Sequence, residues 1–218
     1  MIVEFLKVFY TLIFVWLAGL TALFMLTRTA SSTYRVFLLF IICMAIAETI
    51  GNYQAFRGIK NHWYFNLYYI IQFMTVPVFY YQWLKPSVLK KLIPVFLGIF
   101  LLFIVADILW LQAFENLLTY VFVTGGSFLL VLAGSWLWQL YTSEEVRALN
   151  HYPVFWFSLA YLFYYSIALP YIGMLNYLWA SYPDFTKKYY FVFNMVIILH
   201  NIFLITGFLC LKTTTTKP

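Results

Sequence analysis

Long apolar runs, separated only by short polar links, constrain this chain more than any other feature of its sequence. Each run is close to the ~20 residues that an α-helix needs to cross a hydrocarbon core of about 30 Å. Short links make consecutive helices antiparallel neighbours. The pattern predicts an all-α membrane protein in which residues 1–218 form a single seven-transmembrane-helix bundle. The predicted spans are 8–27, 36–56, 64–84, 92–111, 116–139, 152–177 and 189–211.

Composition excludes a soluble globular protein. Hydrophobic residues make up 65% of the 218 residues and charged residues only 9%, whereas an ordinary soluble domain is about 25% charged. The seven runs consume almost the whole chain, so no separate soluble domain is expected. The net charge of +6 indicates membrane topology and contact with anionic lipid. We therefore expect the lipid bilayer as a partner and no nucleic acid.

Lysine and arginine distribution predicts the orientation of the bundle. One end of the predicted bundle carries Arg28, Arg35, Lys85, Lys90, Lys91, Arg147, Lys212 and Lys217. The opposite end carries Lys7, Arg57, Lys60, Lys187 and Lys188. Since cytoplasmic loops carry the excess of basic residues, the first end is expected inside. The N-terminus is then outside and the C-terminus cytoplasmic.

Motifs of the known membrane chemistries are missing from the sequence. A retinal protein needs a lysine in the middle of its last helix, but Lys187, Lys188 and Lys212 lie at or beyond the ends of the last run. A membrane zinc hydrolase needs about three converging ligands, and His200 is the only histidine well inside a run. No H-E-x-x-H, P-loop or dinucleotide fingerprint occurs. We predict no catalytic residue, no metal site and no cofactor.

Polar residues inside the runs are the candidates for a functional site, because an ionisable group in the membrane is costly and by default suggests function. In the predicted topology they gather in the outer half of the bundle, while the inner halves of the runs are apolar. This distribution predicts an outward-facing polar cup above an apolar plug. The alternative is that these side chains only bond one another between helices, at about 0.6 kcal/mol each. The predicted ligand-binding residues are Glu48, Asn52, Asn66, Gln72, Asp107, Asn194, His200 and Asn201.

Two of these residues are expected to be neighbours. The helical rise puts Glu48 about 18 Å from the inner end of its run and His200 about 16 Å from the outer end of its own, so both lie at similar depth in a core about 30 Å thick. A protonated imidazole would favour the charged form of a carboxylate beside it. We therefore predict a coupled pair of Glu48 and His200. The alternative is that each bonds a nearby amide.

A stripe of small residues follows one face of the second run. Cys43, Ala47, Gly51 and Ala55 recur every four residues, and small residues in membrane helices let a neighbouring helix approach closely. The stripe predicts a helix contact.

Two stretches of the chain resemble a family. Glu48, a short basic loop and then NHWYFNLYYIIQF (residues 61–73), together with YPVFWFSLAYLFYYS (residues 152–166), are similar to a group of small uncharacterised seven-helix membrane proteins of Bacteroidota. Members are often found near sensor kinases, so the resemblance implies a bacterial inner (cytoplasmic) membrane protein with a signalling role, and a membrane sensor kinase as partner. It implies no functional residues.

Three functions remain open on these observations. The first is a receptor-like or accessory signalling protein that binds a small or lipidic ligand in the polar cup. The second is a small-solute or ion transporter or channel, which needs a polar route to the inner face. The third is a lipid-modifying membrane enzyme, which needs carboxylates converging on His200. The extent of the cavity distinguishes the three.

The orientation can be tested by labelling. A membrane-impermeant thiol reagent applied to intact cells is expected to miss a cysteine introduced at Ser87, which lies in the densest basic loop, and to modify one introduced at Asn61. The reverse labelling pattern would place the cup on the cytoplasmic side and remove the receptor hypothesis.

Overall fold

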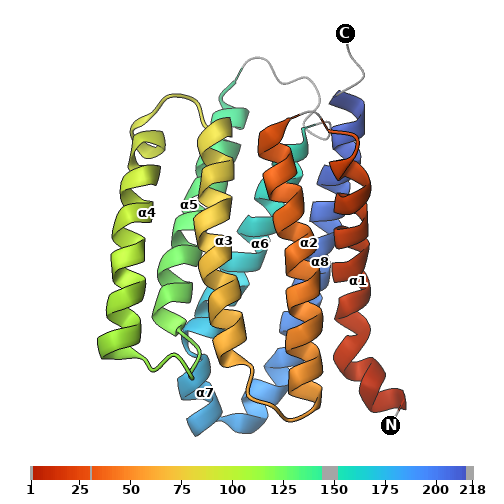
Figure 1. The fold of residues 1–218 in the computed structure, drawn as a ribbon, viewed down its shortest axis with the longest axis vertical. Coiled ribbons are helices and arrows are strands. Elements are labelled where there is room, and N and C mark those ends of the chain that lie inside the picture. Colours follow the sequence, from red (N-terminus) through yellow and green to blue (C-terminus); the bar gives the residue numbers. More distant parts are fainter. Residues whose placement is uncertain (1, 30, 144–151, 215–218) are drawn as a thin grey trace.

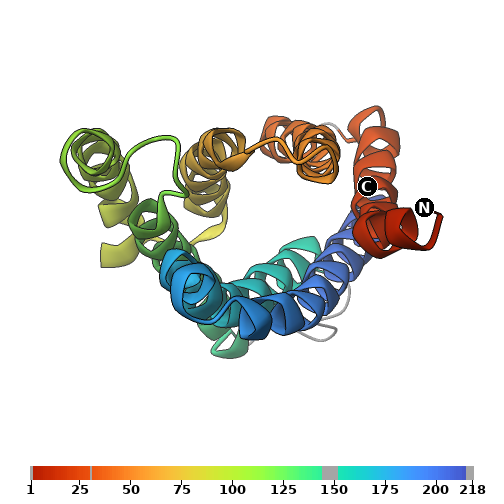
Figure 2. The same cartoon turned by 90° about the horizontal axis from the view of Figure 1, so that it is seen from below.

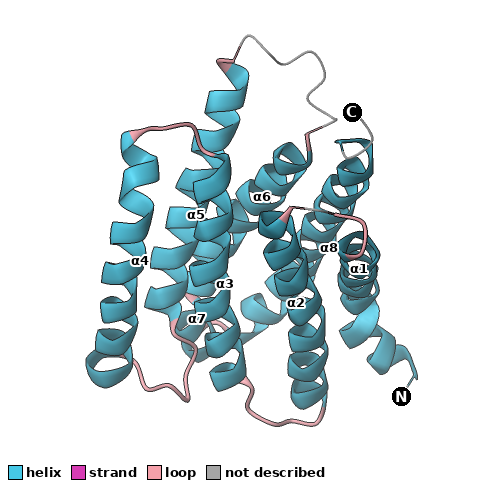
Figure 3. Cartoon of the chain, turned by 45° about the horizontal axis from the view of Figure 1, so that its top comes forward, coloured by secondary structure: helices cyan, strands magenta, loops and turns pink. Residues whose placement is uncertain are grey.

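Every element of the computed structural model is helical across the described residues, 2–29, 31–143 and 152–214. Connections between helices lie at the two ends of the bundle (Figure 3). Arg147 and Lys217, which entered the charge count, lie outside the described residues. The elements are α1 (Ile2–Leu26), α2 (Ser32–Phe56), α3 (His62–Trp83), α4 (Val88–Ala106), the π-helical turn η1 (Asp107–Leu111), α5 (Thr119–Tyr141), α6 (Pro153–Gly173), α7 (Leu175–Ser181) and α8 (Pro183–Thr214).

The described structure confirms the all-α class, and five of its helical segments are long and apolar enough, by length and composition, to cross a membrane. They are Ser32–Phe56, Val88–Leu111, Thr119–Tyr141, Pro153–Gly173 and Pro183–Leu211. Tyr10–Leu26 of α1 is a shorter apolar segment. α3 has 22 residues, but Asn66 and Gln72 and its many tyrosines lower its hydropathy. The count of seven spans therefore stays a prediction.

Six long helices form a closed ring. α1 packs on α2, α2 on α3, α3 on α5, α5 on α6, α6 on α8, and α8 on α1 (Figure 1 and Figure 2). α4 lies outside this ring against α3 and α5, and its Leu102 is 73% exposed. The short α7 lies at the end of the ring where the N-terminus lies, which Figure 1 draws at the bottom. We call this end the lower end and the opposite end the upper end.

Several predicted span boundaries differ from the helices; the largest shifts are at the starts of α1, at Ile2 rather than residue 8, and of α8, at Pro183 rather than residue 189. The sixth run was expected to reach residue 177, but α6 ends at Gly173 and α7 is a separate helix. α5 begins at Thr119 rather than residue 116, because the preceding backbone bonds a side chain of α3 instead of a helical turn. α4 begins at Val88, before residue 92, since the Ser87 hydroxyl accepts a hydrogen bond from the Lys90 backbone N–H (3.2 Å) and caps the helix.

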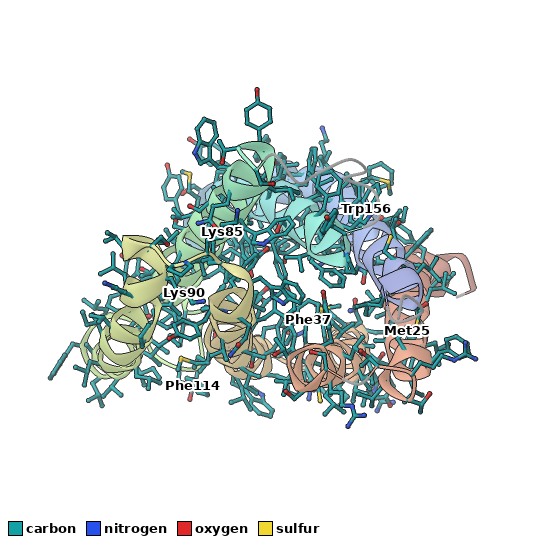
Figure 4. All side chains as sticks on the ribbon, turned by 90° about the horizontal axis from the view of Figure 1, so that it is seen from above. Met25, Phe37, Lys85, Lys90, Phe114 and Trp156 are labelled. Carbon is teal, nitrogen blue, oxygen red and sulfur yellow. The ribbon has the colours of Figure 1, made fainter. Side chains whose placement is uncertain are left out.

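Four phenylalanines from four helices fill the ring toward its upper end, and we call them the aromatic layer: Phe37, Phe79, Phe157 and Phe208. The ring centroid of Phe37 lies 4.5 Å from that of Phe79 and 4.9 Å from that of Phe157, which lies 5.1 Å from Phe208. All four side chains are at most 3% exposed. Phe37 lies inside the ring in the view from above (Figure 4). Aromatic contacts at these separations stabilise beyond area burial, and they form the apolar plug that the sequence predicts.

Glycines let aromatic rings approach the neighbouring helix closely. A Cβ atom placed at Gly125 would lie 2.4 Å from the Phe73 ring, and one at Gly207 would lie 2.4 Å from the Phe157 ring. Gly51 lies in the predicted small stripe of α2. A Cβ atom placed there would lie 2.5 Å from the Phe65 ring. The stripe does face α3 at this point, although Cys43 at its other end is exposed.

The glycine contacts give a stability prediction with a matched control. Gly125→Ala should destabilise the protein by about 1–3 kcal/mol, because an overpacked site forces its neighbours to move, and for a chain of this size each kcal/mol corresponds to roughly 2–4 °C in unfolding temperature. A Cβ atom placed at Gly98 of α4 would have no atom within 4 Å, so Gly98→Ala should leave that temperature unchanged or higher. Thermal unfolding in detergent measures both. Equal losses in the two variants would contradict the packing described for Phe73.

Candidate functional site

A cavity of about 340 Å³ lies at the lower end of the ring, within the size range of small-molecule sites. We call it the main cavity. Its walls come from α1, α2, α3, α6, α7 and α8, and its mouth lies between the link that joins α2 to α3 and α7. Trp179 at the mouth is 51% exposed, whereas Asn194 is 4% exposed. The lining residues are Thr11, Glu48, Gly51, Asn52, Ala55, Asn61, His62, Phe65, Tyr69, Leu117, Tyr164, Tyr171, Ile172, Leu175, Trp179, Tyr190, Phe193, Asn194 and Ile197.

A smaller space of about 20 Å³, the inner niche, adjoins the main cavity. The two share Glu48, Tyr164 and Ile197 in their walls. The niche therefore extends the main cavity toward the middle of the bundle, where Tyr161 begins the packed aromatic region. The niche is lined by Val15, Met44, Glu48, Tyr68, Gln72, Tyr164, Ile197, His200 and Asn201.

Glu48 of α2 lies where the two spaces meet. Its Oε2 accepts a long hydrogen bond from Asn52 Nδ2 (3.4 Å), and the same amide donates a shorter one to the Glu48 backbone oxygen (2.8 Å). This i to i+4 spacing places both side chains on one face of the helix. Tyrosines from three other helices share the surroundings of Glu48: Tyr69, Tyr164 and Tyr190 line the main cavity with it, and Tyr68 lines the niche with it.

His200 of α8 lies at the end of the niche and is 5% exposed. Its Nδ1 lies 3.1 Å from the Ala160 backbone oxygen. Since a carbonyl can only accept, Nδ1 carries the proton and Nε2 is the acceptor in the neutral ring. The rings of Tyr161 and Tyr164 pack on the imidazole at centroid distances of 5.5 and 5.0 Å.

The structure places the predicted pair, Glu48 and His200, in the wall of the same niche. Both side chains line the niche, but among the contacts of the described residues neither a hydrogen bond nor an ion pair joins them. A backbone carbonyl holds His200 and an amide holds Glu48, so the predicted coupling of the two neighbours stays a prediction. α1 lies between their helices and packs on both.

Six of the eight predicted ligand-binding residues line the two spaces. Glu48, Asn52 and Asn194 line the main cavity. Gln72, His200 and Asn201 line the niche, where Asn201 donates from Nδ2 to the Ile197 backbone oxygen (2.8 Å). The structure therefore gathers these side chains, from α2, α3 and α8, around one connected space.

The prediction that Asn66 binds a ligand needs correction. Its side-chain amide forms hydrogen bonds to the backbone of another part of the chain. Nδ2 donates to the backbone oxygens of Phe114 (3.0 Å) and Asn116 (2.7 Å), and Oδ1 accepts from the Leu118 backbone N–H (2.9 Å). Every bond goes to the link between η1 and α5. Asn66 lines neither space and fastens this link to α3.

Asp107 is the second correction. It is 0% exposed in η1 on the helix outside the ring, and it lines neither space. Neither carboxyl oxygen has a hydrogen-bond partner within the described part of the chain. The depth of Asp107 in the fourth run led to the prediction that it lines the polar cup. However, α4 lies outside the ring, so Asp107 lies away from the cavity.

Aromatic residues of the cavity wall were missed by sequence reasoning. Tyr69, Tyr164, Tyr190 and Trp179 line the main cavity, yet rings near helix ends also form the ordinary aromatic belt of a membrane protein. Their position along the helices, at the same depth as the predicted polar residues, could have identified them. Tyr69 lies three residues before Gln72 in the same helix, so the two lie one turn apart.

The side chains that line the two spaces are of the kinds that bind small molecules. The described residues contain no group of three or more His, Cys, Asp or Glu side chains that could hold a metal ion. The walls offer one carboxylate, amides, hydroxyls and aromatic faces. Such a combination, with few polar groups in an aromatic pocket, fixes the orientation of a small molecule.

Comparison of the chain with known proteins found no matching family model, no matching curated protein and no matching solved structure.

The role of Asn66 can be tested by substitution. Asn66→Ala should lower the free energy of unfolding by about 2–4 kcal/mol, because it leaves two carbonyls and one N–H without their partner. Asn176 makes one long bond, from Nδ2 to the Leu117 oxygen (3.2 Å), at an exposed position. Asn176→Ala should therefore cost less than about 1 kcal/mol. Thermal unfolding in lipid nanodiscs would rank the two, and a reversed ranking would refute the fastening role.

Proposed function

We propose that this chain is a receptor-like or accessory signalling protein of the bacterial inner membrane, which binds a small or lipidic ligand in an outward-facing cavity. The observation that carries the proposal is a polar, aromatic-walled cavity at one end of a ring that packed phenylalanines fill beyond it. In this proposal the chain crosses the membrane seven times with the N-terminus outside.

The side of the membrane follows from the basic residues at the other end. Arg28, Arg35, Lys85, Lys90 and Lys91 belong to the upper end, and the hydrogen bond from Lys90 Nζ to the Leu84 oxygen (2.9 Å) holds one of them over the end of α3. Positive residues mark the cytoplasmic side. The main cavity, at the lower end, then opens to the outside.

A transporter or channel is the alternative, and one observation bears on it. A groove of about 400 Å³ lies between α2 and α3 near the upper end, and the polar residues Thr75 and Gln82 line it. However, Val36 and Val78 on its rim are 54% and 47% exposed, so the groove opens on the outer surface of the ring. The buried Phe37 and Phe79 lie between this groove and the interior, which weighs against a continuous polar route.

A lipid-modifying enzyme is the third candidate and has the least support. It needs carboxylates converging on His200, but Glu48 is the only carboxylate in the walls of the niche. His200 Nδ1 is engaged by a backbone oxygen. Chemistry would then depend on one carboxylate and one neutral imidazole without a nucleophile beside them.

Signalling requires that ligand binding alter helix packing, and the cavity walls offer a route. Glu48, Tyr69, Tyr164 and Asn194 stand on four different helices of the ring. A ligand that contacts them favours one arrangement of those helices, to the extent that it binds that arrangement better. A membrane sensor kinase is the proposed recipient of the change.

The proposal is tested by identifying what the cavity retains. Wild-type protein is extracted into nanodiscs with its native lipids, and bound molecules are identified by mass spectrometry. Ala55→Trp fills the exposed mouth of the cavity and should reduce the retained molecule at least about tenfold, a loss of about 1.4 kcal/mol in affinity.

Ile50→Trp is the matched control. Ile50 is an exposed residue of the same helix and does not line the cavity, so the retained molecule should remain. Identical molecules and amounts in both variants would overturn a binding role for the cavity. Uptake of the identified molecule into proteoliposomes would instead favour the transporter.

A further inference from the structure

We infer that the main cavity binds the ammonium group of an organic cation, either a protonated amine or a quaternary ammonium. The inference rests on the proposed function and names the ligand class for the same cavity. It is argued from the charge of the walls, the environment of Glu48 and the aromatic faces around it.

The walls carry a single charged residue, and it is acidic. Glu48 is the only Asp, Glu, Lys or Arg among the described residues that line the main cavity. Basic residues do exist at this end of the molecule, but Arg57, Lys60 and Lys188 are exposed and absent from the lining. The guanidinium of Arg57 lies 6.0 Å from the centroid of the Tyr53 ring, which also lies outside the lining. The described lining therefore offers a ligand one acidic side chain and neither a lysine nor an arginine.

The protein leaves the Glu48 carboxylate weakly engaged. Its one side-chain hydrogen bond in the described structure is the 3.4 Å contact with Asn52, at the long limit for such a bond. A charged group inside a membrane protein is costly unless it is paired. An ammonium group in the cavity would supply the pairing that the protein itself does not.

Aromatic rings line the same space and suit the same ligand. Tyr69, Tyr164, Tyr171 and Tyr190 contribute rings, and Trp179 stands at the mouth. The face of an aromatic ring attracts a cation, and cages of such rings are the usual way of binding quaternary ammonium groups. The rings are also held in place: Phe193 packs on Tyr171 at 5.0 Å and on Tyr164 at 5.8 Å between centroids.

Ligands of other charge fit less well. An anion would meet the carboxylate and would find no lysine or arginine among the described residues of the walls. A polyol would need many donors and acceptors, whereas rings make up much of this lining. The ammonium group could belong to a free amine or to a lipid headgroup, and the experiment distinguishes these two sources.

The test compares a cation with its uncharged isostere. The full chain is placed in nanodiscs of phosphatidylglycerol, a lipid without an ammonium group. Choline and 3,3-dimethylbutan-1-ol, which have the same shape and differ in charge, are titrated by calorimetry, together with tetramethylammonium and butylammonium. At least one cation should bind, and choline should bind at least tenfold tighter than the alcohol.

Variants localise the effect. Glu48→Gln should bring choline and the alcohol within about twofold of each other. Asp107→Asn removes a carboxylate outside the cavity and should leave the ratio unchanged. Repeating the titration with phosphatidylcholine or phosphatidylethanolamine in the nanodisc identifies the source: a weaker apparent affinity for choline indicates a lipid headgroup, and an unchanged affinity indicates a free amine.

Two results would overturn the inference. One is equal or tighter binding of the alcohol by the wild-type protein, and the other is no binding of any of the three cations. Either result leaves the proposed function standing if the native-lipid preparation still retains another molecule that Ala55→Trp releases. Failure of that retention would instead count against the proposed function itself.

Discussion

The close fit of aromatic rings against glycine decides which part of this bundle is tightly packed and which part contains a cavity. Inside a membrane the burial of apolar surface gives no preference for helix contact over lipid contact, so the shape of the interface decides. Phe73 on Gly125 and Phe157 on Gly207 bring α3, α5, α6 and α8 close together. Toward the lower end no comparable layer of phenylalanines fills the interior of the described bundle, and the main cavity begins there.

Some buried polar atoms near the candidate site lack hydrogen-bond partners. The buried hydroxyl of Tyr165 and the Oδ1 of Asn201 have no hydrogen-bond partner within the described residues. They belong to α6 and α8, beside the niche or one step from it. Buried polar groups normally find partners, so each exception calls for an explanation. Such atoms are not confined to the candidate site, since both oxygens of Asp107, outside the ring, also lack partners within the described part of the chain, whereas the hydroxyls of Tyr80 and Ser158 lie 3.0 Å apart in the packed region.

Sequence reasoning predicted the helical class and, among the residues that line the two spaces, six polar ones, because hydropathy and depth depend on position along a helix. It failed where the answer depended on which helices meet. Asp107 has a suitable depth but stands on α4, outside the ring. Asn66 has a suitable depth and a place in the ring, yet it faces the link before α5. The helix order could not be predicted for Glu48 and His200 either: α1 stands between their helices, although both side chains line the niche.

The order of the helices in the ring also decides how a ligand can act. Glu48 on α2 and Asn194 on α8 are divided by α1 along the ring, so a molecule held by both spans the interior rather than one helix contact. The helices that it joins also supply rings to the aromatic layer, Phe37 from α2 and Phe208 from α8. A packed layer responds to a small displacement by adopting another packing, because interiors have little free volume. In the proposed signalling role, this layer would pass occupancy of the cavity to helix positions at the upper end, because it packs the same helices that line the cavity.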